Sequence, residues 1–198
     1  LHTLLCRLDN RYMTQYMAQP VTIKPAQRFS RTFLMTISIM TFGMLLGGLY
    51  FATVYEKGDG FSTYEREAIA VVVMQNDISE GWNEIVEAFE TASIGSQDDH
   101  VVLYSTNQVA IRAMISDSQA VINRWKAIDV PEAHVVSHGI GLEALKATQD
   151  GLILFDIFFQ SSIDTLVADQ IQSDEAAAKL ATARELWEQA AAVAATEG

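Results

Sequence analysis

The feature that most constrains the fold of this chain is an apolar run from Thr32 to Val54 that contains no charged residue. As an α-helix, its 23 residues extend about 35 Å, which covers a hydrocarbon core of about 30 Å. Backbone groups inside a bilayer must bond within their own segment, so a single crossing is a helix. A signal peptide or a soluble core helix fits less well, because the run is long and 31 residues precede it. We therefore predict one N-terminal transmembrane helix over residues 32–55.

The charges on the two sides of this run differ in sign. Residues 1–31 hold five basic side chains and one acidic side chain, whereas residues 55–198 hold 8 basic and 24 acidic side chains. Basic residues near a span are retained in the cytoplasm. We therefore expect a single-pass protein of the bacterial plasma membrane, with the N-terminus in the cytoplasm and the C-terminal domain in the periplasm or outside the cell. The only cysteine, Cys6, then lies on the cytoplasmic side, and the exported part has no disulfide.

The segments on either side of the span are predicted to be an arm and a linker. Residues 1–31 form a cytoplasmic arm, in which leucine and tyrosine recur at helical spacing before Pro20. That spacing fits an amphipathic helix on the inner membrane surface or against a partner, and a frayed tail fits equally well. Residues 56–61 contain the sequence Gly-Asp-Gly and are expected to be a linker.

Residues 62–198 have the composition of a helical domain. They contain one proline, no alternating strand pattern and many Ala, Glu, Gln and Leu residues. Short links between long helices make consecutive helices antiparallel. The sequence therefore predicts an all-α fold, in which the transmembrane helix is followed by an exported, antiparallel up-down four-helix bundle. The expected helices run over Ser62–Thr91, from Asp98 or Asp99 to Asp129, over Pro131–Ala168, and from Ser173 or Asp174 to Ala195.

The third of these helices has polar residues on the stripe that the heptad pattern predicts to be buried. His138, Gln149 and Asp156 fall on that stripe among apolar residues. An unpaired buried carboxylate is unfavourable, so Asp156 needs a hydrogen-bond donor, and antiparallel pairing places Tyr104 near its level. We expect Asp156 to be a satisfied core residue that fixes the helix register, with a proton-handling role as the alternative.

Apolar residues surround Asp156 on every face of the helix, in the sequence LILFDIFF. A bundle helix needs only one apolar stripe, so the surplus should contact something else. We expect a protein partner there, and the alternative is a wide core filled by large side chains. The residues expected to contact the partner are Ile153, Leu154, Phe155, Ile157 and Phe158.

A possible metal site is given by His134 and His138, which stand four residues apart. On a helix this spacing points both rings the same way, as in sites for zinc, copper or haem iron. A catalytic metal needs a third protein ligand, and no HExxH, ExxH or HxxE pattern supplies one. The alternative is that both are ordinary polar residues near the first turn of a helix.

Small residues mark one face of the predicted span. Gly43 and Gly47 form a GxxxG pattern, and Gly48 lies beside them. Such residues allow two helix backbones to approach closely in lipid. We expect this face to pack on a neighbouring transmembrane helix.

The acidic exported part excludes one class of partner and favours another. Its carboxylates would repel nucleic acid, and they could attract a basic soluble electron carrier such as a small cytochrome, an effect that salt weakens.

The layout of a basic arm, one span with Gly43 and Gly47, and an acidic bundle containing VPEAHVVSHGIGLEAL resembles single-span accessory subunits of bacterial electron-transfer complexes. The small helical subunit of alternative complex III is one example. The resemblance implies a subunit that binds no cofactor and braces larger, cofactor-bearing neighbours. The layout is also similar to the ligand-sensing bundle of a chemoreceptor, although such a bundle lies between two spans and this sequence has one.

These features lead to one expected function and one alternative. No nucleophile–base pair, paired acids or phosphate-binding loop is evident, so we expect no enzyme and no cofactor. The chain is expected to be a non-catalytic accessory subunit of a multi-subunit membrane complex, of the respiratory or photosynthetic electron-transfer kind. The alternative is a free-standing, membrane-anchored bundle that binds a small ligand or a metal ion near His134 and His138.

Overall fold

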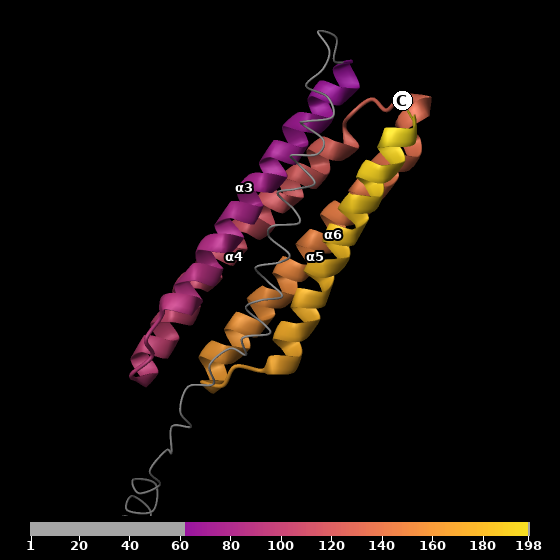
Figure 1. Ribbon diagram of the computed structural model, residues 1–198. Coiled ribbons are helices and arrows are strands. Elements are labelled where there is room, and N and C mark those ends of the chain that lie inside the picture. The colour runs from indigo at the N-terminus through magenta and orange to yellow at the C-terminus, as the bar shows by residue number, and fades with distance from the viewer. Residues whose placement is uncertain (1–61, 198) are drawn as a thin grey trace, which may run out of the picture.

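The computed structural model describes residues 62–197, and within this range the chain is helical without a strand. The prediction of four helices in an all-α domain is confirmed (Figure 1). No helix in this part of the chain has both the length and the apolar character needed to cross a bilayer. The arm, the span over residues 32–55 and the linker lie outside the described residues. The elements are α3 (Thr63–Thr91), α4 (Gln97–Lys126), the 3-10 turn η2 (Glu132–His134), α5 (Val135–Thr165) and α6 (Gln170–Glu197).

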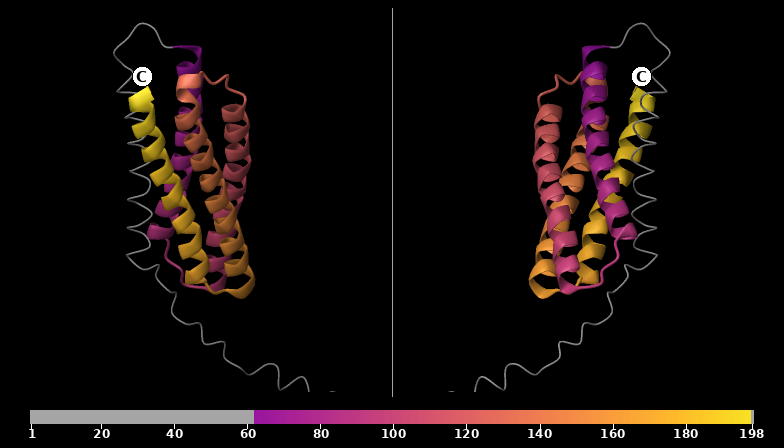
Figure 2. Two further views of the ribbon diagram at one scale, coloured as in Figure 1. Left: turned by 90° about the vertical axis from the view of Figure 1, so that its right-hand side faces the viewer. Right: turned by 90° about the vertical axis from the view of Figure 1, so that its left-hand side faces the viewer.

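Consecutive helices run antiparallel, as Figures 1 and 2 show. At one end of the bundle α3 and α5 begin while α4 and α6 end; we call this the Tyr64 end. The opposite end, where α4 and α6 begin, we call the His100 end. Within the described residues, no Cα atom of α3 lies within 8 Å of a Cα atom of α6. The closest backbone approaches between long helices are therefore those of consecutive helices, α3 with α4, α4 with α5 and α5 with α6.

Aromatic side chains connect α3 to α5 across the interior. The ring centroids of Trp82 and Phe155 are 4.4 Å apart, and those of Phe89 and Phe159 are 5.4 Å apart. Because the backbones of α3 and α5 do not approach each other closely, large rings are needed to fill the space between them.

The N-termini of α3 and α4 are each capped by a capping box. A serine followed three residues later by a glutamate predicts a capping box. In the structure the Ser62 hydroxyl accepts from the Glu65 backbone N–H while the Glu65 carboxylate accepts from the Ser62 N–H, so the predicted box is confirmed. Ser96 and Asp99 form a second capping box. The expected start of α4 at Asp98 or Asp99 is therefore one or two residues late, because the helix begins at Gln97 and its cap is Ser96.

The link between α5 and α6 differs from the expected one. Helix α5 ends at Thr165 rather than at Ala168, because Leu166 adopts a left-handed conformation with φ of 57°. Helix α6 begins at Gln170 rather than at Ser173 or Asp174. The carboxylate of Asp169 accepts from the backbone N–H of Ile171 at 2.9 Å. Asp169 therefore caps α6 by accepting from an N–H group that has no partner within the helix.

The expected inward face of α3 is confirmed, but that of α5 is rotated. The helical spacing of apolar residues in α3 predicts an inward stripe, and every member is buried except Phe89, which is partly buried. The stripe consists of Tyr64, Ala68, Val71, Ile78, Trp82, Ile85, Val86 and Phe89. On α5, the heptad pattern predicts a buried stripe of Val135, His138, Leu142, Leu145, Gln149, Leu152, Asp156, Phe159, Ile163 and Leu166. Only Leu145, Leu152 and Phe159 of this stripe are buried, and Val135 at its start is 56% exposed. Helix α5 packs on both α4 and α6, so it buries a wide arc that includes small residues the heptad pattern passed over. Those small buried residues are Ser137, Gly141, Ala144, Ala147, Thr148, Gly151 and Ser162.

Candidate functional site

The densest group of polar and aromatic side chains lies at the Tyr64 end of the bundle. His138 on α5 stacks on Trp125 of α4, with ring centroids 4.5 Å apart and an interplanar angle of 6°. The indole Nε1–H of Trp125 donates to the backbone carbonyl of His138 at 3.0 Å. Tyr64 of α3 stacks on His134 at 4.8 Å, and its hydroxyl lies 3.5 Å from Nδ1 of His138. This cluster therefore joins the ends of α3, α4 and α5.

The last residue of α6 completes the cluster. The carboxylate of Glu197 accepts from the hydroxyl of Ser137 at 2.5 Å and from its backbone N–H at 3.4 Å. It also lies 3.6 Å from Nδ1 of His134. No side chain of the preceding residues caps α5, so Glu197 serves as a cap supplied by another helix, and its negative charge suits a helix N-terminus.

Both histidines of the expected pair lie against Tyr64. His134 belongs to the 3-10 turn and precedes the first residue of α5, so the two histidines do not share regular helical turns. The ring of His134 stacks on Tyr64 and approaches Glu197, whereas the ring of His138 stacks on Trp125 and lies beside the Tyr64 hydroxyl. Within residues 62–197, no group of three His, Cys, Asp or Glu side chains is placed to hold a metal ion. The arrangement of His134 and His138 is that of a packed junction between helix ends.

Burial in this junction lowers the pKa of His138 below its ordinary value, and a hydrogen bond with the backbone of Trp125 opposes that change only partly. A histidine with a lowered folded-state pKa binds its proton more readily in the unfolded chain. Its contribution to stability is therefore complete above the unfolded pKa of about 6.5 and is lost as the pH falls below that value.

We accordingly expect the full-length chain in mild detergent to lose free energy of unfolding between about pH 7.5 and about pH 5.5. Urea titrations followed by tryptophan fluorescence at both values measure the loss. The His138→Gln variant is the control, because it keeps a polar side chain but cannot take up a proton. An equal loss in the variant and the parent chain would assign the pH dependence to other groups.

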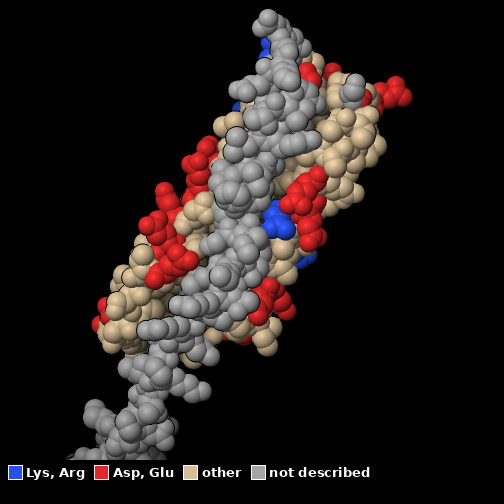
Figure 3. Space-filling model, in the orientation of Figure 1, with Lys and Arg blue, Asp and Glu red and all other residues tan. Residues whose placement is uncertain are grey.

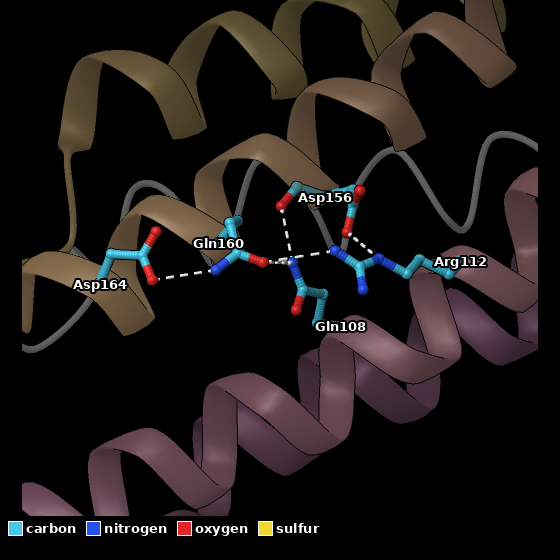
Figure 4. Close-up of polar contacts among 5 residues, drawn as sticks. All are labelled: Gln108, Arg112, Asp156, Gln160 and Asp164. Atoms are coloured by element: carbon cyan, nitrogen blue, oxygen red, sulfur yellow. Dashed lines mark hydrogen bonds and ion pairs between the residues drawn. The ribbon is translucent and has the colours of Figure 1, made fainter.

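A second polar group crosses the surface between α4 and α5 (Figure 4). The guanidinium Nε of Arg112 donates to the Asp156 carboxylate at 2.8 Å, and Gln108 donates both to the Asp156 carbonyl and to Gln160. Asp156 is therefore half-buried at the edge of the helix pair, and its donor is Arg112 rather than Tyr104. Because the Arg112 side chain is 54% exposed, the ion pair contributes little to stability and mainly fixes the register of the two helices.

The residues expected to contact a partner separate into two groups. Phe155 and Phe158 are each 1% exposed and belong to the bundle's own core, so they are not available to a partner. Ile153 and Ile157 are 40% and 50% exposed, and Leu154 is half-buried. Helix α5 thus uses its large rings internally and keeps two isoleucines, one turn apart, on its outer face.

A related cluster, which was not predicted, lies at the His100 end. The His100 ring stacks on Tyr104 at 4.3 Å, and its Nε2 lies 3.0 Å from the carbonyl oxygen of Ser162. Burial raises the pKa of the Tyr104 hydroxyl well above its ordinary value, so this phenol stays protonated. The spacing of His100 and Tyr104, four residues apart in a helix, was the available signal. Glu197 gave no comparable signal, because its partners lie about 60 residues away in the sequence.

The glycines expected to pack the span, Gly43, Gly47 and Gly48, lie outside the described residues. No protein-family model, no curated protein and no solved structure matches this chain.

Proposed function

We propose that this chain is a non-catalytic accessory subunit of a multi-subunit membrane complex, of the kind that carries out respiratory or photosynthetic electron transfer. The observation that carries the proposal is the uncharged run over residues 32–54, followed within a few residues by an acidic helical bundle. In this arrangement the run anchors the chain in the plasma membrane, and the bundle stands on the periplasmic side.

Two surfaces support docking to larger subunits. In the span, Gly43, Gly47 and Gly48 offer a face for close packing on another helix. On the bundle, Ile153 and Ile157 expose apolar area on the outer face of α5. Aliphatic side chains at the centre of a patch and polar residues around them are the usual composition of a protein–protein interface. Asp150 and Gln160, both exposed, lie within one turn of these isoleucines.

The acidic surface supports a further contact with a basic, soluble electron carrier. Figure 3 shows groups of acidic side chains along the length of the visible face. Examples on one helix are Glu80, Glu84, Glu87 and Glu90 of α3. Such a surface raises the association rate of a basic partner, and salt reduces the effect.

The direct test is to purify the tagged full chain from its native membrane in mild detergent and to identify the proteins that accompany it. We expect a fixed set of large membrane subunits. Replacing Gly43 and Gly47 together with leucine should remove most of that set, because leucine prevents close backbone approach.

A second variant tests the bundle surface. Ile153→Lys with Ile157→Lys should weaken the association, whereas Val73→Lys with Ile171→Lys, at exposed apolar positions on α3 and α6, is the matched control. If the parent chain purifies alone, the accessory-subunit proposal is wrong and the free-standing module is favoured. If both lysine pairs behave alike, the α5 surface is not the docking surface.

A further inference from the structure

An exposed apolar tip occupies the Tyr64 end of the bundle. Val135 and Val136 begin α5 and are 56% and 60% exposed, and Pro131 and Ala133 in the link before them are also exposed. Val135 and Val136 are neighbours in the chain, and both directly follow His134, whose ring stacks on Tyr64 near the start of α3. We call Pro131, Ala133, Val135 and Val136 the valine tip.

The length of the chain between the span and α3 limits where this tip can be. Seven residues, 55–61, separate the apolar run from Ser62, and they reach at most about 25 Å. Helix α3 has 29 residues and is about 43 Å long. The bundle therefore cannot stand on its His100 end, because the Tyr64 end would then lie farther from the membrane than the connection allows.

Two orientations remain, with the bundle standing on its Tyr64 end or lying on its side. Lying flat would bring rows of carboxylates, such as those of α3, against the headgroups of a bacterial membrane, whose anionic lipids repel them. Standing would instead bring the valine tip to the headgroup layer, where exposed apolar side chains gain by leaving water.

We propose that the valine tip rests in the interfacial layer of the bilayer and holds the bundle upright on the membrane. The inference rests on the proposed membrane anchor and adds to it a specific lipid contact by residues far from the span in sequence. Charges of both signs lie at the same end with a small acidic excess, so charge supplies no net attraction to anionic lipids; these residues are Arg66, Arg124, Lys126, Glu65, Glu67, Asp129, Glu132 and Glu197. The contact is therefore carried by apolar burial and should be insensitive to salt.

The test uses the full chain, with Cys6→Ser as background, reconstituted into phosphatidylcholine vesicles that contain a minority of phosphatidylglycerol. A cysteine placed at Val136→Cys carries an environment-sensitive fluorophore. The matched control is Val167→Cys, a valine 58% exposed in the α5–α6 link at the His100 end. Circular dichroism and vesicle flotation of both labelled proteins confirm folding and membrane association.

We expect the label at 136 to shift its emission to the blue and to lose intensity when lipids with spin-labelled headgroups are included. The label at 167 should show neither effect, and high salt should change neither result. If the protein floats with the vesicles but the label at 136 is as exposed to water as that at 167, the tip does not contact lipid and the anchor still stands. Quenching at both positions means a bundle lying flat and also overturns the inference. If the protein does not float, the anchor itself is wrong and the inference falls with it.

Discussion

Replacing Phe155 with alanine should lower the free energy of unfolding by about 3–5 kcal/mol, the range for removing a buried aromatic ring. Phe155 is 1% exposed, and its ring lies 4.4 Å from that of Trp82 and 6.3 Å from those of Phe158 and Phe159. It fills the space between α3 and α5, whose backbones are too far apart to close around a smaller side chain. Urea unfolding of the full chain in mild detergent, followed by circular dichroism, measures the loss.

The control for this substitution lies two residues earlier on the same helix. Because Ile153 is 40% exposed, Ile153→Ala should lower the free energy of unfolding by about 1 kcal/mol or less, well below the loss in Phe155→Ala. A comparable loss in the two variants would mean that Ile153 is buried by a contact within the protein. An unchanged stability in Phe155→Ala would mean that the ring does not connect α3 to α5.

The second large effect is expected at Gly141, where α5 passes the indole of Trp125. A Cβ atom at Gly141 would lie 2.7 Å from Cζ2 of Trp125 and 3.3 Å from its Cε2. The indole is rigid, stacked on His138 and bonded through Nε1 to the His138 carbonyl, so it cannot yield without losing these contacts. Although alanine is favoured over glycine in a helix by about 1 kcal/mol, we expect overpacking to dominate in Gly141→Ala, with a net loss of about 1–3 kcal/mol.

Gly139→Ala is the matched control, since it makes the same chemical change two residues away. No atom lies within 4 Å of a Cβ built at Gly139. This variant should gain up to about 1 kcal/mol from helix propensity alone. Tryptophan emission should change in Gly141→Ala and stay constant in Gly139→Ala, because only the first displaces Trp125. Equal stabilisation by both substitutions would contradict the close contact between α4 and α5.

Local signals in the sequence were sufficient for the helices whose ends and faces depend on near neighbours. The capping box of Ser62 and Glu65 involves residues three apart, and the stripe from Tyr64 to Val86 repeats at a helical period, so α3 could be predicted in its bounds and its buried face. The existence of helix α5 could be predicted, but the set of residues that it buries could not. It packs on α4 and α6 at once, and the resulting wide arc follows from the positions of two other helices.

The candidate site illustrates the same limit. His134 and His138 could be identified from their spacing. The groups around them, Trp125, Tyr64 and Glu197, could not be identified because they come from three other helices. The hydrogen-bond partner of Asp156 was likewise expected from α4. Whether Tyr104 or Arg112 reaches it depends on the rotation of the two helices about their axes, which the apolar pattern did not specify.

Four long helices over residues 62–197 follow from the amino-acid sequence alone, because helix propensity, capping and apolar period are encoded by residues within a few positions of one another. The large rings that fill the space between α3 and α5, and the stacking of the histidines on Tyr64 and Trp125, are known only from the way the helices pack. These outcomes depend on how four helices share one interior volume, and no single helix carries that information in its own sequence.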